Sequence, residues 1–506
     1  MVSPARGWAK VAENRARSFR MMGRMLGADR RTFFEAQRPR LWPPGRGARL
    51  DGRCLSFLVA ALAGVTASCG ESDADEPTPS FSACDGEQFT ICDILEARCQ
   101  DAILSTMECL REQPVGAPPP TRTISAEQYR AELEAATAEQ TNPDGTQIAE
   151  QALVSLGLAS TGDFTAQAWV DLNVETVPAY YSSLDDSVTF VVSDEVTDPG
   201  SLMVLLAHEY VHFLQDQTVD LVAFRQAAAT TDADFASTSV IEGEAEMLST
   251  FFASALWGLD DTTVDYRSRF TSWVDRVEEQ LADESPLLAT PRYFPYSFGA
   301  RYVYNVYEQG GIPAVRDLFD TPPAGTLPVL LSERSVSDVE VDPMADLSFP
   351  PPLDGFALAF WDTLGAWVYG KFLAHGDPAH DDGQMAHWRG DRLVVYVDSA
   401  LNVVVLWRLR LDAEQAAENL RSAFAQDFPV APSRGGVLLD GRDVILVTTS
   451  AGLDEQTWIS RAGGPWDAPL PEPTDVDTTE NGAAKPPSLA QVLRPRWRRH
   501  GVPFPR

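Results

Sequence analysis

The residues best suited to chemistry lie in the segment His208-Glu209-Tyr210-Val211-His212, which reads H-E-x-x-H. The segment falls in an apolar run from Ser201 to Gln217 that predicts a helix. Residues four apart project from the same face of a helix, so both imidazoles can bind one metal ion. Glu209 lies beside them, where its carboxylate can take a proton from a metal-bound water. Since the chain has only six histidines, this spacing argues for a metal site.

A catalytic zinc site has three protein ligands and keeps a fourth position for water. Glu242 is the best candidate for the third ligand, because it follows His212 by thirty residues in a second helical run from Asp232 to Leu256. Glu246 shares a face with Glu242 and is expected to hydrogen-bond a ligand histidine from behind. The predicted metal ligands are therefore the two histidines and Glu242.

The segment Glu242 to Glu246 also has a plainer explanation, in which its acids form a solvated face of an acidic protein. Its position one helix after H-E-x-x-H favours the metal site over that alternative. Glu244 is kept as the alternative ligand. Gly243 is expected to let the helix approach the metal closely.

In such a site, zinc lowers the pKa of its bound water to about 7 and Glu209 accepts the proton. The resulting hydroxide attacks a carbonyl, and Glu209 then returns the proton to the leaving amine. Tyr296, in the aromatic segment Tyr293 to Gly299, is the candidate oxyanion donor, with a purely structural core tyrosine as the alternative. The strand predicted at Val188 to Val192 could bind extended peptide if it forms an exposed edge.

Charge excludes some partners. The 506 residues include 40 Lys and Arg against 73 Asp and Glu, a net charge of -33. The segment from Met1 to Ser68 is rich in Arg and poor in acids, so the remainder of the chain is more acidic still. Such a surface repels nucleic acid and anionic membranes, and neither is expected as a partner. Membrane contact is expected only through a lipid anchor.

A short apolar stretch, Leu55 to Ser68, is followed by Cys69 and Gly70. It is too short to span a bilayer but suits the apolar region of a signal peptide. The run Thr66 to Cys69 resembles a bacterial lipoprotein box, in which the Cys is lipidated, although Thr66 stands where Leu is usual. We therefore expect residues 54–69 to direct export, with plain secretion or a buried helix as alternatives. Residues 1–53 fit an upstream, mis-assigned start codon or a cytoplasmic extension.

Four cysteines, Cys84, Cys92, Cys99 and Cys109, lie close together in the chain after this stretch. An even set in a short exported segment predicts two disulfides, whereas a four-cysteine zinc site would need paired C-x-x-C knuckles. Cys92 and Cys99 would lie about 10 Å apart on one continuous helix, too far to bond to each other. The connectivity is otherwise open.

Pro-rich and acidic stretches divide the chain into segments. The predicted segments are a tether at 70–83, a disulfide-bearing helical unit at 84–112, a stiff linker at 116–123, a metallopeptidase domain at 123–340, a C-terminal α+β unit at 355–460 and a disordered tail at 463–506. Within them we expect a hairpin of Val177–Tyr181 with Val188–Val192, a helix ending at Gly310-Gly311, a buried helix at Ala357–Ala374, strand pairs at Arg392–Val397 with Val403–Leu409 and within Gly436–Thr449, and a helix at Glu414–Ala425. The predicted fold class is α+β, mostly helical with a small antiparallel sheet in the first domain.

Other polar clusters are weaker candidates. His375, His380, Asp381, Asp382 and His387 could bind a second metal, but a polar connecting loop is the simpler explanation. Gln215, Asp216 and Gln217 are expected to cap and brace the end of the H-E-x-x-H helix. No nucleophile elbow, P-loop or dinucleotide fingerprint competes with the metal motif.

These residues also carry a family resemblance. HEYVHFLQDQ followed by IEGEAE resembles the gluzincins, and more specifically bacterial secreted proteins or lipoproteins with an H-E-x-x-H-x-L-Q-D-Q helix and a downstream E-G-x-A segment. The likeness covers roughly Thr123 to Thr449. It implies a zincin-like fold with His208, His212 and Glu242 as zinc ligands and Glu209 as the base. Tyr296-x-x-Gly299 is similar to a segment of some gluzincin peptidases.

The sequence thus predicts a zinc metallopeptidase that is exported and anchored at the cell envelope, acting on peptides or proteins. One alternative is an envelope scaffold lipoprotein whose zincin domain has lost catalysis, which the intact Glu209 disfavours. Another is a zinc hydrolase of non-peptide amides or esters.

Overall fold

The computed structural model describes residues 84, 90–138, 143–192, 198–259, 263–281, 293–332, 350–376, 385–427, 434–450 and 453–463. All of these described residues belong to one compact unit. The predicted N-terminal extension, the signal peptide with Cys69, the tether and the tail after Gly463 lie outside them. Within the described part, no helix is long and apolar enough to cross a membrane.

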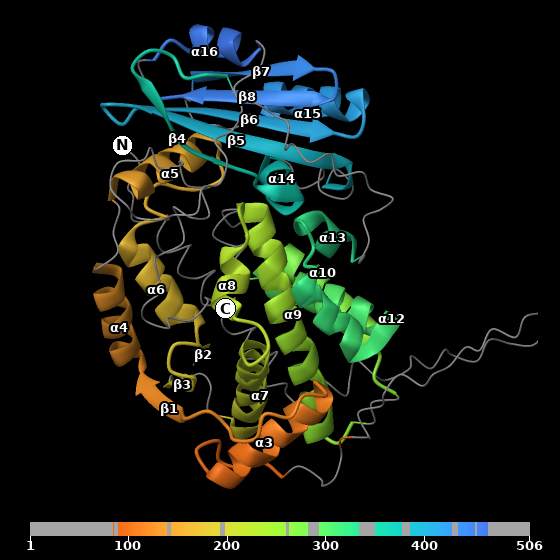
Figure 1. Ribbon diagram of the computed structural model, residues 1–506. Coiled ribbons are helices and arrows are strands. Elements are labelled where there is room, and N and C mark those ends of the chain that lie inside the picture. Colours follow the sequence, from red (N-terminus) through yellow and green to blue (C-terminus); the bar gives the residue numbers. More distant parts are fainter. Residues whose placement is uncertain are drawn as a thin grey trace, which may run out of the picture. The chain divides into compact units, whose positions relative to one another are not determined.

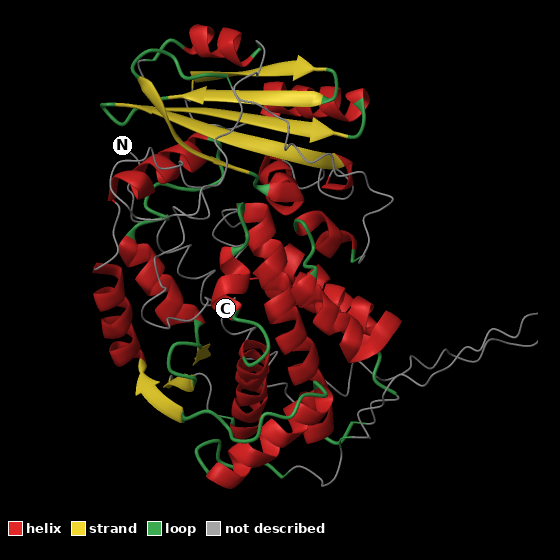
Figure 2. Cartoon of the chain, in the orientation of Figure 1, coloured by secondary structure: helices red, strands yellow, loops and turns green. Residues whose placement is uncertain are grey.

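Helices and two separate sheets make up this mixed α+β unit (Figures 1 and 2). The helices are α3 (Ala97–Leu110), α4 (Ala126–Ala138), α5 (Pro143–Ser155), α6 (Ala166–Thr176), α7 (Pro199–Asp216), α8 (Leu221–Gln226), α9 (Thr231–Leu256), α10 (Tyr266–Leu281), the π-helix η2 (Phe294–Phe298), α12 (Gly299–Asp320), α13 (Thr326–Leu331), α14 (Gly365–Gly376), the 3₁₀ turn η5 (Met385–His387), α15 (Glu414–Asp427) and α16 (Glu455–Ala462). The fold class predicted from the sequence is confirmed at this level.

The smaller sheet has three strands in the order β1 (Thr121–Ser125), β3 (Ser187–Val192), β2 (Ala179–Ser182). Strands β2 and β3 form the predicted antiparallel hairpin, but β1 pairs with β3 in parallel, so the sheet is mixed. A parallel partner needs a long crossover, which α4 to α6 provide between β1 and β2. The strand β3 is central in the sheet, so the condition for peptide binding by strand addition, an exposed edge, is not met.

The second sheet has the order β4 (Phe356–Asp362), β5 (Trp388–Asp398), β6 (Val403–Leu411), β8 (Asp443–Thr449), β7 (Arg434–Asp440), and all its pairs are antiparallel. Alternate residues of β5 enter different clusters: Leu393 and Val395 pack with residues of α5, α14 and α15, whereas Val394 and Tyr396 pack with Trp458 of α16. Helices therefore cover both faces (Figure 1), which explains the continuous apolar runs in these strands.

The predicted single helix from Ala357 to Ala374 is wrong. Its first part is the strand β4, and α14 begins only at Gly365, whose φ of +91° needs a glycine. An apolar run of this kind does not distinguish a buried strand from a buried helix by periodicity, and the break lies in the turn that precedes Gly365.

Helix α9 packs against both α7 and α12, and α7 and α9 carry the predicted metal ligands (Figure 1). Asp198 caps α7 by accepting a hydrogen bond from the amide of Ser201, and Pro199 occupies the first turn. Helix α12 breaks at Gly310 and Gly311, where the sequence predicted its end, and a further helical stretch follows to Asp320.

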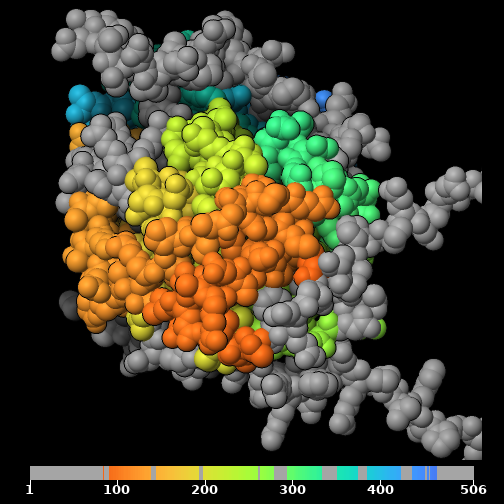
Figure 3. All heavy atoms as spheres, turned by 60° about the horizontal axis from the view of Figure 1, so that its bottom comes forward, coloured from red at the N-terminus to blue at the C-terminus, as the bar shows by residue number. Residues whose placement is uncertain are grey.

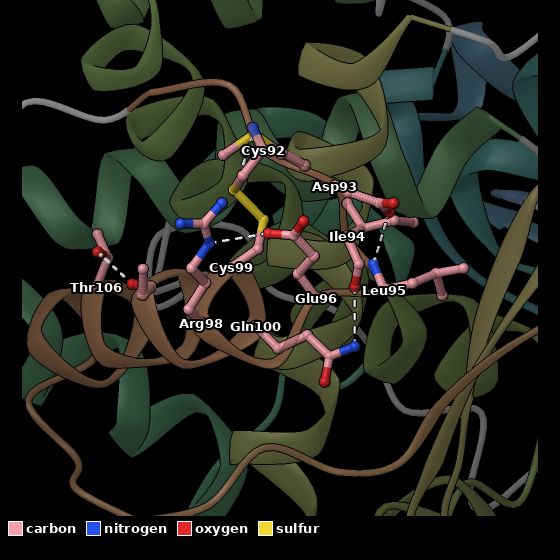
Figure 4. The surroundings of a disulfide bond; sticks show 11 residues. Cys92, Asp93, Ile94, Leu95, Glu96, Arg98, Cys99, Gln100 and Thr106 are labelled. Carbon is pink, nitrogen blue, oxygen red and sulfur yellow. Dashed lines mark hydrogen bonds and ion pairs between the residues drawn. A yellow bond between two sulfur atoms is a disulfide. The ribbon is translucent and has the colours of Figure 1, made fainter.

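The predicted pair of disulfides is confirmed, as Cys84–Cys109 and Cys92–Cys99. The second pairing was expected to be out of reach on a continuous helix. Instead α3 begins at Ala97, so Cys92 lies in the chain before the helix and the two Cα atoms are 5.9 Å apart. Figure 4 shows this bond joining the incoming segment to the first turn of α3.

Candidate metal centre

Helix α7 holds both histidines of the H-E-x-x-H segment in the interior, because almost every residue of this helix is buried. His208 is 2% exposed and His212 8% exposed. Their four-residue spacing brings the rings to a centroid distance of 4.7 Å, and the two Nε2 atoms are 3.0 Å apart. The helix therefore presents two imidazole nitrogens toward one point.

Glu242 comes to the same point from α9, which packs directly against α7. Its Oε2 lies 3.3 Å from Nε2 of His208 and 3.4 Å from Nε2 of His212, and the carboxylate is 2% exposed. These three residues are the group within the described chain whose ligand atoms gather closely enough to hold a metal ion. The ligand set predicted from the sequence is thus brought together.

The spacing of these donors can be tested against metal geometry. Tetrahedral zinc binds nitrogen and oxygen at about 2.0–2.1 Å, which places two ligand atoms about 3.3 Å apart. The observed separations of 3.0, 3.3 and 3.4 Å agree with that value. Two imidazoles and one carboxylate also match the donor set of catalytic zinc sites, so the residues fit a metal ion of this kind.

The electrostatics of the cluster favour a positive charge between the donors. Burial by itself would lower the pKa of His212, but the negative charges of Glu242 and Glu209 raise it to about 9. Burial would likewise raise the pKa of Glu242, yet the adjacent imidazoles hold it well below its usual range. A buried carboxylate between two imidazoles is therefore an environment that stabilises a cation.

No protein-family model, curated protein or solved structure matches the chain. What the site can bind therefore follows from its own geometry. That geometry shows a buried His-His-Glu group able to bind a metal ion, on a mixed α+β scaffold.

The second nitrogen of each histidine has its own partner. Nδ1 of His208 lies 3.4 Å from Oε1 of Glu246, where the sequence predicted this glutamate. Nδ1 of His212 lies 2.9 Å from Oε1 of Gln215, one turn further along α7. Partners at the non-ligating nitrogen fix the ring orientation and tautomer of a metal ligand.

Gln215 is a residue whose role the sequence did not reveal, since it was expected only to brace the helix end. The other two residues of that segment do so: Asp216 accepts a hydrogen bond from the amide of Leu221, and Gln217 is the C-cap of α7. The sequence feature that could have revealed this role is the spacing of three residues between His212 and Gln215, which places both side chains on one helix face.

Glu244 is not a ligand. Its side chain is fully buried and pairs with Nε of Arg111 at 3.0 Å and with Nε2 of Gln215 at 2.9 Å. Gly243 also differs from expectation. A side chain at this position would point toward Gly299 on α12 and not toward the proposed metal ligands. The solvated-face explanation fails for Glu242 and Glu244, which are both buried.

Glu209 and Tyr296 are the predicted catalytic groups. Glu209 is 2% exposed, and its charge acts on His212, so its carboxylate lies beside the cluster. Tyr296 is 4% exposed within η2, which packs against α9, the helix that carries Glu242. π-Helical turns are often found at functional sites. The oxyanion role of Tyr296 stays a prediction.

The second histidine cluster is only partly within the described residues. His387 lies in η5, and its Nδ1 is 2.9 Å from Oδ1 of Asp412, which directly follows β6. His380, Asp381 and Asp382 lie outside the described residues. Among the residues that the structure describes, His387 and its neighbours do not form a second set of metal ligands.

Proposed function

We propose that this protein is a zinc-dependent peptidase of the gluzincin type, with a zincin-like catalytic domain. The observation that carries the proposal is the convergence of three donor atoms from His208, His212 and Glu242 at separations of 3.0 to 3.4 Å. Zinc is the metal of choice because two imidazoles with one carboxylate are its usual catalytic ligand set. Glu209, adjacent to the first ligand, supports a hydrolytic use of the site over a purely structural one.

A bound zinc ion would supply a Lewis acid that lowers the pKa of water and polarises a substrate carbonyl. Glu209 acts as general base for the attacking water and afterwards donates that proton to the leaving amine. Glu246 and Gln215 hold the ligand imidazoles in orientation through Nδ1. In this proposal the Tyr296 hydroxyl donates to the developing oxyanion.

Peptides or proteins are the proposed substrates, because an acid-base glutamate that delivers a proton to an amine suits amide cleavage. Export of the enzyme is proposed as well. The disulfides Cys84–Cys109 and Cys92–Cys99 support it, since such bonds persist in oxidising compartments. In a bacterial cell, lipidation at Cys69 would anchor the chain to the envelope.

The decisive experiment compares wild-type protein with Glu209→Gln and His212→Ala. Glu209→Gln should bind one equivalent of zinc and lose peptide cleavage by at least about 100-fold, the lower range for a general base. His212→Ala should lose both zinc and cleavage. Persistent cleavage by Glu209→Gln contradicts the mechanism.

The same preparations separate the alternative functions. A wild-type protein that binds zinc but cleaves nothing in a peptide library would be a scaffold or a hydrolase of other substrates. Hydrolysis of simple amide or ester substrates, lost in Glu209→Gln, then identifies the latter.

A further inference from the structure

A buried chain of polar side chains runs from the metal centre to Arg111 at the end of α3. It begins at Nδ1 of His212, which lies 2.9 Å from Oε1 of Gln215. Nε2 of Gln215 donates to Oε2 of Glu244 at 2.9 Å, and Nε of Arg111 donates to Oε1 of the same carboxylate at 3.0 Å. Gln215 and Glu244 are 0% exposed and Arg111 is 1% exposed.

The partners of Gln215 fix the direction of its amide. The nitrogen donates to two acceptors, the carbonyl oxygen of Ile241 and the carboxylate of Glu244, both at 2.9 Å. The amide oxygen must therefore face His212, and because it can only accept, Nδ1 of His212 carries the hydrogen. A neutral ring then has its lone pair on Nε2, the atom directed at Glu242.

Arg111 reaches this chain from the disulfide-bearing segment. It is the C-cap of α3 and follows Cys109, the partner of Cys84, by two residues. Its Nη1 donates to the carbonyl oxygen of Leu214 on α7 at 2.9 Å, and its own carbonyl accepts from Arg316 of α12 at 2.7 Å. The orange segment that includes α3 lies at the surface in Figure 3, whereas the Arg111 side chain that follows this helix is buried.

We propose that Arg111, Glu244 and Gln215 are positioning residues for the metal, and that together they set the tautomer and orientation of His212. The proposal rests on the metal centre of the proposed function but not on peptide cleavage. Arg111 supplies the positive charge that keeps a fully buried carboxylate at Glu244 favourable. That carboxylate holds the Gln215 amide in one orientation, and the amide in turn holds the imidazole.

Glu244→Gln is the sharpest test, because it is nearly isosteric but replaces one acceptor oxygen with an NH₂ donor. The new NH₂ group must then face either Arg111 or the amide nitrogen of Gln215, and both of these are donors. The charged Arg111 keeps the remaining oxygen as its acceptor, so the NH₂ group faces Gln215. Gln215 is forced to turn its own nitrogen toward His212, which favours the ring hydrogen on Nε2. Gln215→Leu removes the link altogether.

Both variants should bind zinc about 10- to 100-fold more weakly than wild type, measured by competition with a chromophoric chelator. The visible absorption spectrum of the Co²⁺-loaded protein should also change, since it reports the ligand field that His212 contributes to. A residue with only a structural role lowers the unfolding midpoint without altering the spectrum.

Matched controls break buried polar contacts elsewhere. Asn173→Leu removes a buried amide of α6, and Asp443→Asn weakens a buried carboxylate held by arginines in the second sheet. Both should be less stable yet bind zinc within about twofold of wild type. The proposal is overturned if Gln215→Leu and Glu244→Gln both bind zinc as tightly as wild type and keep its Co²⁺ spectrum, even if the wild type cleaves peptides. If both variants lose zinc affinity as expected but the wild type cleaves no peptide, only the proposed peptidase function is overturned.

Discussion

Substituting Gly243 by alanine tests whether α9 and α12 touch through their backbones. Gly243 lies next to the proposed ligand Glu242, and a Cβ at this position would lie 2.4 Å from the carbonyl oxygen of Gly299 and 2.5 Å from its carbonyl carbon. The opposing glycine is equally constrained, because its own Cβ would lie 2.5 Å from the carbonyl oxygen of Ser239. The substitution therefore places one methyl group where the backbones of two helices come close, with Cγ2 of Val303 also only 2.9 Å away.

The size of the effect follows from two opposing contributions. Carbon contacts are favourable at about 3.5–4.0 Å, so the helices would have to separate by about 1 Å. Overpacking of this kind costs about 1–3 kcal/mol, and the upper value applies here because the obstructing atoms are backbone. Alanine gains about 1 kcal/mol over glycine in a helix interior. We expect Gly243→Ala to lose about 2 kcal/mol of the free energy of unfolding.

Equilibrium unfolding in denaturant measures this change from the shift in midpoint at constant slope. Gly200→Ala in α7 is the matched control, because its Cβ would meet nothing closer than 3.3 Å, a side-chain oxygen of Asp198. That variant should stay within about 1 kcal/mol of wild type, because only one side-chain oxygen has to move by a few tenths of an ångström. If Gly243→Ala is also as stable as wild type, the close approach of α9 and α12 is refuted.

Further expectations concern pH, the disulfides and zinc. Burial raises the pKa of Asp362 from 3.8 to about 7, so between these values the folded state holds a proton that the unfolded state releases, and stability falls as pH rises through that window. Asp362→Asn should make this part of a plot of unfolding midpoint against pH less steep, although burial also raises the pKa of Asp232 to about 7 and keeps some slope. An unchanged slope would contradict the prediction. Removing the Cys84–Cys109 disulfide by serine substitution should weaken zinc binding in a competition assay because it frees the end of α3, whereas removing Cys92–Cys99 at the start of α3 should weaken it less. If removing either disulfide weakens zinc binding equally, the end of α3 does not transmit the effect to the metal site. Zinc at about a thousandfold excess over its Kd should stabilise the fold by about 4 kcal/mol, and a chelator should abolish that gain in thermal unfolding.

The parts of the structure that depend on local pattern could be predicted from the sequence. Helix α7 follows from its cap at Asp198 and its apolar run, and the spacing of its histidines then fixes their common face. The β2–β3 hairpin and the β5–β6 pair follow from short β-prone runs separated by turns. Glu242 could be proposed because the ligand chemistry requires a third donor and one acidic helix follows.

The parts that depend on distant partners could not. Strand β1 is short and partly polar, and it is a strand only because β3, which comes three helices later in the chain, accepts it in parallel. The link from Arg111 to Glu244 joins two residues far apart in the sequence, so nothing near either residue indicates the other. The Cys92–Cys99 pairing depended on where α3 begins, and helix starts are poorly fixed by propensity.

The three glutamates of α9 show how burial assigns different roles to identical side chains. Glu242 and Glu246 share a helix face, with Glu242 at the Nε2 atoms of both histidines and Glu246 at Nδ1 of His208. Glu244 points away from that face, and there Arg111 compensates its charge.

The two proposed ligand histidines are consequently held by different groups, a carboxylate behind His208 and an amide behind His212. A carboxylate in place of the Gln215 amide would lie against Glu244 and the carbonyl of Ile241, both of which accept hydrogen bonds from the amide nitrogen at 2.9 Å. Those contacts would become repulsive, because a second buried negative charge would lie beside that of Glu244. The amide is therefore required at position 215 by the groups behind it, and the direction of its dipole gives His212 the tautomer that a metal ligand needs.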